Sequence, residues 1–131
     1  MPVAIDTSVL IAGEKLGDFD ALLPKNEAGP FYIPAHAAAE FLVGTHPPVK
    51  AELRRRAAAL YQNRFRALVS HFTEADAAAL AALISELRGK GQQMKFFDAA
   101  IAATVISRGD KLLAVDSDFD RVKDRVKLLS P

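Results

Sequence analysis

The sequence predicts an α/β domain with a mainly parallel sheet. Short apolar runs typical of strands alternate with longer segments in which apolar residues recur every three or four positions, as on one face of a helix. Strands that alternate with helices pair in parallel through helical crossovers. The 131 residues suit one domain with its own core, and the 24 alanines indicate that this core is helix-rich and finely packed. We therefore expect a single domain over residues 1–131.

Five strands are predicted from short runs of β-branched, aromatic or aliphatic residues bounded by turn signals or polar residues. They cover, in chain order, residues 3–5, 31–33, 67–70, 112–115 and 126–129. The segment from Pro24 to Pro30 has the composition of a turn-rich loop, and a second loop is expected over residues 88–93.

Helices are predicted between these strands from capping residues and apolar spacing. They cover residues 9–11, 35–43, 50–66, 73–87 and 97–107. Thr7 and Ser8 are good N-caps for the first helix, and Thr73 followed by Asp76 resembles a capping box for the fourth. The fifth is apolar on nearly every side, so we expect it to be buried, with Gly109 as its C-cap.

The net charge of +1 conceals an uneven distribution. Six basic residues against one acid give residues 50–66 a charge of +5, which leaves −4 for the rest of the chain. We expect Arg55 and Arg66 on the solvent-facing side of this segment. Charge alone leaves two interpretations open, an ordinary solvated helix face or a surface that contacts phosphates.

Several classes of protein are excluded by composition. The chain has no cysteine, which excludes disulfides, zinc–thiolate sites and thiol catalysis. No apolar run approaches the roughly 20 residues needed to cross a bilayer, so we expect no membrane association. The first six residues lack a basic stretch and reach an acid after three apolar residues, so we expect a cytoplasmic protein without a secretory signal.

Four acidic residues stand in apolar surroundings. Asp6, Glu40, Asp98 and Asp116 each follow or interrupt an apolar run, where an ionised carboxylate is costly unless a cation or several donors compensate it. Any one of them is as readily explained by a structural role such as helix capping. Asp6 and Asp116, however, each end a predicted strand, and the carboxyl ends of parallel strands form the ligand crevice of an open α/β sheet.

Four carboxylates that converge at one edge repel one another, so such a cluster requires a divalent cation. A set of oxygen ligands without histidine or cysteine favours Mg²⁺ or Mn²⁺ over zinc. The histidines His36, His46 and His71 show no ligand spacing, and we interpret them as ordinary residues. A cation held by carboxylates could orient a water and neutralise charge on a phosphodiester, which gives the basic segment a plausible use.

The order of these motifs resembles that of PIN-domain ribonucleases, and most of all the VapC-type toxins of prokaryotic toxin–antitoxin pairs. The motifs that carry the resemblance are IDTSVLI from Ile5, AAAEFLVG around Glu40, FDAAIAA from Phe97 and AVDSDF from Ala114. The first is weakly specific alone, whereas all four in this order span essentially the whole chain.

The resemblance implies a three-layer α/β/α domain with a five-stranded, mainly parallel sheet. It implies an endoribonuclease that cleaves single-stranded RNA with one or two Mg²⁺ or Mn²⁺ ions, forms a homodimer and is inhibited by an antitoxin. Asp6, Glu40, Asp98 and Asp116 match the acid positions of the family, and Ser8 matches a supporting hydroxyl. Asp118 is a further candidate beside the fourth acid. Ala114 departs from the pattern, because the family often has Thr there.

Two other functions stay open. A nuclease-dead module that binds RNA or a protein partner would have no physical reason to keep four unpaired acids. A PIN-domain nuclease of RNA processing would act without an antitoxin, and an adjacent reading frame for an antitoxin would discriminate against it. A haloacid-dehalogenase-type phosphatase is excluded because Ser8 stands where it needs a second Asp, and a receiver domain is excluded because Asp6 has no adjacent acid.

Overall fold

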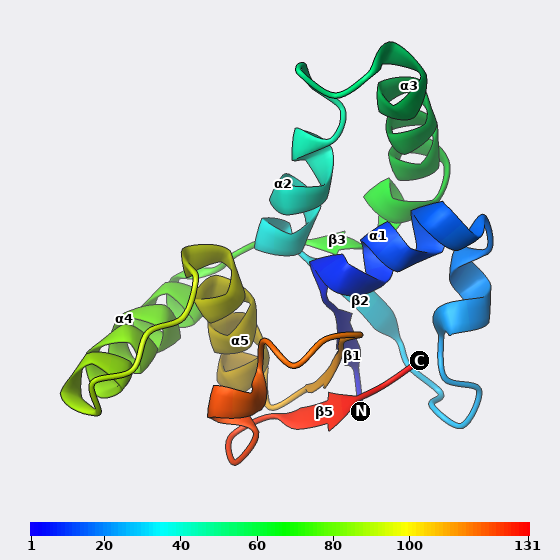
Figure 1. Ribbon diagram of the computed structural model, residues 1–131. Coiled ribbons are helices and arrows are strands. Elements are labelled where there is room, and N and C mark those ends of the chain that lie inside the picture. The colour runs from blue at the N-terminus through cyan, green and yellow to red at the C-terminus, as the bar shows by residue number, and fades with distance from the viewer.

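Five parallel strands form one sheet in the computed structural model, which describes all residues 1–131 (Figure 1). The strand order is β3-β2-β1-β4-β5. The strands are β1 (Val3–Ile5), β2 (Phe31–Pro34), β3 (Val69–Ser70), β4 (Lys111–Leu113) and β5 (Lys127–Leu129). The predicted parallel sheet of five strands is therefore confirmed, although β3, β4 and β5 are each shorter than predicted.

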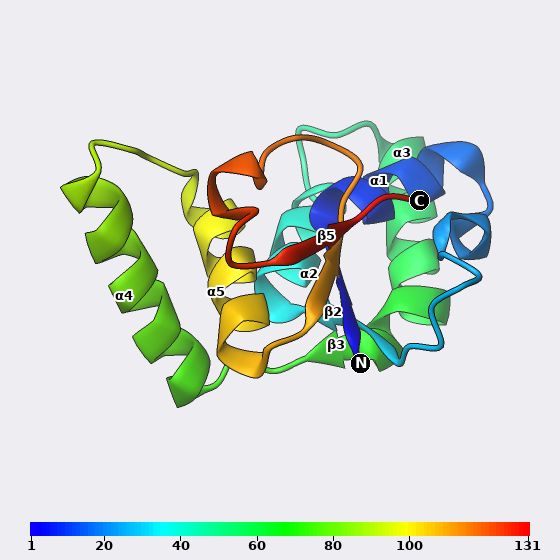
Figure 2. The same cartoon turned by 90° about the horizontal axis from the view of Figure 1, so that it is seen from below.

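Helices cover both faces of this sheet and complete three layers. The α-helices are α1 (Thr7–Leu16), α2 (Ala35–Val43), α3 (Ala51–Leu60), α4 (Glu74–Gly89) and α5 (Phe96–Arg108). Figure 2 shows α1 and α3 on one side of the strands and α5, with α4 outside it, on the other. No helix combines the length and the apolar character that a membrane span requires.

The order in which the chain adds strands to the sheet reverses next to β1. It passes from β1 outward to β2 and β3, and then crosses to β4 on the other side of β1. β1 pairs in parallel with both neighbours, with Ala4 opposite Tyr32 on one side and Leu112 on the other. The carboxyl ends of β1 and β4 therefore flank the switch point, where open α/β sheets bind their ligands.

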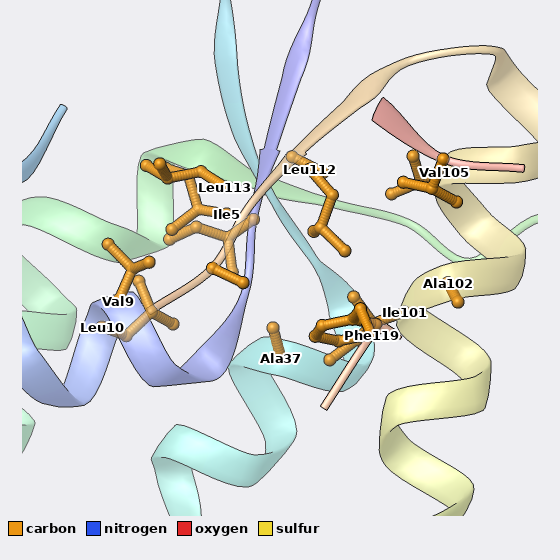
Figure 3. Close-up of a cluster of buried hydrophobic side chains, with 14 of the residues drawn as sticks. Ile5, Val9, Leu10, Ala37, Ile101, Ala102, Val105, Leu112, Leu113 and Phe119 are labelled. Atoms are coloured by element: carbon orange, nitrogen blue, oxygen red, sulfur yellow. The ribbon is translucent and has the colours of Figure 1, made fainter. Parts of the chain in front are cut away.

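The core lies between the central strands and the helices that cover them (Figure 3). Ile5 and Leu113 are fully buried, and α5 is buried along Ala99–Val105 as its apolar sequence predicts. The alanines of α5 let the helix approach the sheet closely. Gly109 ends α5 in the left-handed conformation (φ 67°), which confirms it as the predicted C-cap.

The predicted single helix over residues 50–66 is wrong in its second half. α3 ends at Leu60, a π-helical turn covers Tyr61–Phe65, and a 3₁₀ turn follows at Arg66–Leu68. The wide turn accompanies the burial of Phe65, whose ring packs edge-on against Phe19 and Phe41 at 4.8 and 5.0 Å. Tertiary packing thus overrides the regular helical spacing of the sequence.

Two helix starts differ in how well the sequence predicts them. Asp6, and not Thr7 or Ser8, is the N-cap of α1, because its side chain accepts a hydrogen bond from the Ser8 amide. Thr73 is the N-cap of α4 and forms the predicted capping box with Asp76. α4 continues to Gly89 and thus takes in the start of the predicted loop.

Candidate active site

Asp6 occupies the carboxyl end of β1, where it begins α1 and is only 3% exposed. Its Oδ2 accepts hydrogen bonds from the Ser8 amide at 3.1 Å and from the Ser8 hydroxyl at 2.6 Å. The same hydroxyl accepts a hydrogen bond from the backbone N–H of Val115 at 3.1 Å. Ser8 therefore holds the Asp6 carboxylate and ties it to the segment that follows β4. Oδ1 of Asp6 is buried and has no hydrogen-bond partner.

Glu40 reaches the same region from α2. Its Oε1 accepts a hydrogen bond from the Thr7 hydroxyl at 2.7 Å. Thr7 lies directly after Asp6, so one short segment orients two of the four acids. Sequence reasoning considered Thr7 only as a cap, and a hydroxyl adjacent to a strand-end acid is the signal that could have singled it out.

Asp98 lies in the first turn of α5, facing this group of acids. The N-cap of α5 is Lys95 and no side chain caps the helix, so the alternative that Asp98 is a cap is wrong. Burial, and after it the charges of neighbouring acids, raise the pKa of Asp98 to about 6. These acids are Asp118, Asp6, Glu40 and Asp116. The other three predicted acids, together with Asp118, are therefore within electrostatic reach of Asp98.

Asp116 and Asp118 belong to the exposed segment after β4. Oδ1 of Asp116 accepts a hydrogen bond from the Asp118 amide at 3.3 Å. Phe119, which directly follows Asp118, is fully buried and anchors the segment. We predicted Asp118 as a secondary candidate, and its charge is the largest influence of any neighbouring acid on Asp98. It is thus a fifth member of the acid cluster, which we define as Asp6, Glu40, Asp98, Asp116 and Asp118.

No basic side chain neutralises the acid cluster. The five ion pairs of the structure all involve other carboxylates. Burial raises the pKa of Asp6 to about 6, against the lowering effect of its Ser8 hydrogen bonds, and the charge of Asp116 adds to the rise. Both Asp6 and Asp98 thus carry negative charge at neutral pH at an energetic cost that a bound cation would relieve.

A divalent cation fits this donor set by its chemistry. The cluster offers carboxylate oxygens without any sulfur or imidazole ligand, which suits Mg²⁺ or Mn²⁺. The unpartnered Oδ1 of Asp6 is a free ligand at its centre. No three of these carboxylates, however, lie close enough together in this structure to form a finished coordination shell.

An open hollow of about 340 Å³ adjoins the acid cluster. Three acids, Asp98, Asp118 and Asp120, line it together with two basic residues, Lys95 and Arg121. The hollow thus contains both acids and cations, the charges that a metal ion and a phosphate backbone would require together.

The basic segment is only partly available to a ligand. Arg54 and Arg56 donate to backbone carbonyls, and Arg64 forms an ion pair with Asp20 at 2.5 Å. Arg55 and Arg66 are exposed as predicted, and Arg66 donates to its neighbour Gln62. Half of the charge that the sequence assigns to one solvent-facing surface therefore stabilises the fold.

The sequence matches the family model of the PIN domain over residues 3–125. The chain belongs to the PIN-domain family. This confirms the family that the four motifs resemble, and the three-layer fold with them. No curated protein matches the sequence.

Solved structures share this fold over nearly the whole chain. VapBC2 from Rickettsia felis, bound to a DNA fragment from its promoter, aligns with a TM-score of 0.79 at 16% identity, covering 100% of this chain and 99% of that one. VapBC-5 from Mycobacterium tuberculosis aligns at 0.77 and 22% identity, covering 99% and 98%. VapC20 from the same organism, described as a toxin that cleaves the sarcin–ricin loop, aligns at 0.64 and 21% identity, covering 92% and 94%.

Proposed function

We propose that this protein is a Mg²⁺- or Mn²⁺-dependent endoribonuclease that hydrolyses single-stranded RNA. The observation that carries the proposal is the acid cluster: five carboxylates without an ion-pair partner, in which Asp98 feels the charges of the other four and buried Asp6 stands at the carboxyl end of β1. An acidic site would repel a phosphate backbone by itself. Loaded with a divalent cation, it would attract one.

The side chains have separate tasks in this proposal. Asp6 and Asp98 would be the main ligands of the cation, and Glu40 and Asp116 would complete its shell. When bound, the cation would orient and activate a water and offset the charge that develops on the phosphate. Thr7 orients Glu40 and Ser8 orients Asp6, so both hydroxyls are positioning residues.

The surroundings of the site supply cations for the RNA chain. Lys95 and Arg121 stand beside the acid cluster. Arg55 and Arg66 lie on the basic segment, and we assign to them a contribution to backbone binding that depends on salt concentration. Single-stranded RNA suits an open hollow better than a duplex because its backbone and bases can adapt to a shallow site.

The cellular role that fits this enzyme is the toxin of a type II toxin–antitoxin pair. The solved structures that share the fold over the whole chain include toxin–antitoxin complexes from several bacteria. The partner would be a cognate antitoxin, and the protein would act as a cytoplasmic homodimer. An arginine from the antitoxin could compete with the cation, because guanidinium pairs bidentately with carboxylate.

The decisive experiment is cleavage of single-stranded RNA by the purified protein with Mg²⁺ or Mn²⁺. We expect EDTA to abolish cleavage and Asp98→Asn to reduce it by at least 100-fold, on the order of the loss seen when a metal site or its shell is damaged. Asp124→Asn is the matched control, since Asp124 is exposed and makes no hydrogen bond or ion pair. Cleavage that survives both EDTA and Asp98→Asn would contradict the proposal.

A further inference from the structure

A second hollow, of about 270 Å³, lies between the end of α4 and the start of α5. We call it the α4–α5 hollow; its lining residues used below are Leu87, Arg88, Gln92, Gln93, Met94 and Phe96. Phe96 is 57% exposed, although a large aromatic side chain usually finds cover in a fold of this size. An exposed aromatic ring at the rim of a hollow is a feature that requires an explanation.

The α4–α5 hollow adjoins the hollow beside the acid cluster. Met94 lines both this hollow and the hollow that contains Asp98 and Asp118. Arg121 donates a hydrogen bond to the backbone carbonyl of Gln93, which fastens the connecting segment to the short 3₁₀ helix η4 (Asp120–Val122). Figure 2 shows this segment returning from α4 to the start of α5 beside η4.

The ring of Phe96 is supported from behind by other aromatic groups. His36 contacts it edge-on with ring centres 5.8 Å apart, and Phe97 does so at 6.1 Å. His36 is one turn before Glu40 on α2, so this support comes from the same helix as one of the acids. The ring is therefore held in place near the acid cluster while more than half of its surface stays open.

The chemistry of the lining favours one class of ligand. Leu87, Met94 and Phe96 form an apolar wall, whereas the side chains of Gln92 and Gln93 make no hydrogen bond within the protein. Arg88 is exposed and forms no ion pair. A nucleobase has the matching properties, an aromatic face that stacks on a ring and a polar edge that pairs with amide and guanidinium groups. The cations Lys95 and Arg121 of the adjoining hollow are available to the neighbouring phosphates.

We propose that the α4–α5 hollow binds one nucleobase of the RNA substrate, next to the phosphate that reaches the acid cluster. Phe96 stacks on the base, and Arg88, Gln92 and Gln93 contact its edge. This inference rests on the proposed nuclease function for the identity of the ligand, and it names where base preference arises. Phe96 is then a specificity-determining residue, outside the group that would hold the cation.

The test measures base stacking separately from cleavage. A short single-stranded RNA that carries the fluorescent base 2-aminopurine is titrated with the Asp98→Asn protein, which leaves the RNA intact. We expect the fluorescence to be quenched on binding, Phe96→Ala to weaken binding about tenfold and remove the quenching, and Phe96→Tyr to retain both. Leu16→Ala is the matched control, because Leu16 is 58% exposed on α1 and lines neither hollow. Circular dichroism establishes that each variant is folded.

The outcomes separate this inference from the nuclease proposal. If the wild type cleaves RNA and folded Phe96→Ala binds it with unchanged affinity and quenching, the base site is overturned while the nuclease stands. If the wild type fails to cleave RNA but binds it through Phe96, the base site stands without the nuclease. If Phe96→Ala changes only the mass of the protein in solution, the α4–α5 hollow is an interface between protein copies, and the inference is overturned.

Discussion

The two ends of α5 treat a buried charge in opposite ways. At the last turn, Arg108 donates to Oδ2 of Asp76, a carboxylate with no exposed surface, and also to the Ser70 hydroxyl and the His71 carbonyl. At the first turn, Asp98 faces a group of like charges and forms no ion pair. One helix thus has a compensated ion pair at its last turn and an acid without a paired cation at its first turn.

The pKa values follow this difference. Burial alone would raise the pKa of Asp76, but the Arg108 and Thr73 hydrogen bonds and the Arg108 charge bring it below the usual value. Burial raises the pKa of Asp6 to about 6 because no cation opposes it. Both Asp6 and Asp76 leave one buried oxygen without a partner, so an unpartnered oxygen alone does not distinguish them. The absence of a counter-charge does, and it marks the acid cluster, to which Asp6 and Asp98 both belong, as the place that needs a ligand.

Stability should depend on pH with opposite sign at the ion pair of Asp76 and at the acid cluster. The lowered pKa of Asp76 contributes stability above its ordinary value of 3.8, and this contribution is lost as the pH falls through the folded pKa. The raised pKa of Asp6 contributes stability that is complete below 3.8 and is lost as the pH rises through about 6. Without metal, the acid cluster therefore destabilises the fold at neutral pH.

The largest effect is expected at the ion pair. Arg108→Met should lower the free energy of unfolding by about 3–5 kcal/mol, because it leaves the Asp76 carboxylate buried without its cation. Urea denaturation at pH 7 measures the change. Lys123→Met is the control, since Lys123 is exposed and unpaired. Adding Asp76→Asn to Arg108→Met should recover part of the loss, and a double variant less stable than Arg108→Met would break the comparison.

The opposite sign is expected at the acid cluster. Asp6→Asn in EDTA should raise the free energy of unfolding at pH 7.5 by about 2 kcal/mol, since it removes an uncompensated buried charge. The gain stays below the roughly 3 kcal/mol that the pKa rise represents, because the new amide NH₂ needs its own partner. The gain should vanish at pH 4, where Asp6 is protonated. A loss of stability at pH 7.5 would show that the charge is compensated after all.

Metal binding should stabilise the protein by compensating the charge of the acid cluster. At a Mg²⁺ or Mn²⁺ concentration ten times the dissociation constant, the wild type should gain about 1.4 kcal/mol, or roughly 4 °C in Tm. Asp6→Asn should lose this response, whereas Asp124→Asn should keep it. Differential scanning fluorimetry over a metal titration measures all three, and an equal response in all three proteins would place the metal elsewhere.

The smallest effect on stability is expected at Thr7. Thr7→Val keeps the shape of the side chain but removes the hydrogen bond to Glu40, at a cost of about 1 kcal/mol in the free energy of unfolding. Its effect on RNA cleavage should be larger than its effect on stability, because Glu40 loses its orientation. Thr45→Val removes a hydrogen bond to the Leu42 carbonyl and should lower stability alone. Equal cleavage by the two variants would exclude a positioning role for Thr7.

The sequence signal that predicts the acid cluster is local. Asp6 and Asp98 stand within apolar runs. The strand before Asp6 and the helix that contains Asp98 can each be recognised from a few neighbouring residues. The parallel order of strands then places the acids at one edge. The identity of the N-cap of α1 was missed because Asp6, Thr7 and Ser8 are all suitable caps, and only the backbone geometry chooses among them.

Contacts between distant segments could not be predicted in the same way. Arg108 meets Asp76 across 32 residues, and Arg64 meets Asp20 across 44. The helical spacing separates Arg64 from the solvent-facing Arg55, but nothing in the local pattern identifies Asp20 as the partner of Arg64. The π-helical turn at Tyr61–Phe65 is likewise decided by the aromatic rings that Phe65 meets in the core.

The hydroxyl of Ser8 joins two parts of the chain that are made at different times. It donates to Asp6 and accepts from Val115, 107 residues later. During synthesis the N-terminal part of a protein emerges first, so Asp6 waits for nearly the whole chain before β4 pairs with β1 and brings Asp116 beside it. If the proposed function holds, the acid cluster would therefore stay incomplete, and the protein inactive towards RNA, until the segment that carries Asp116 has emerged and β4 has paired with β1.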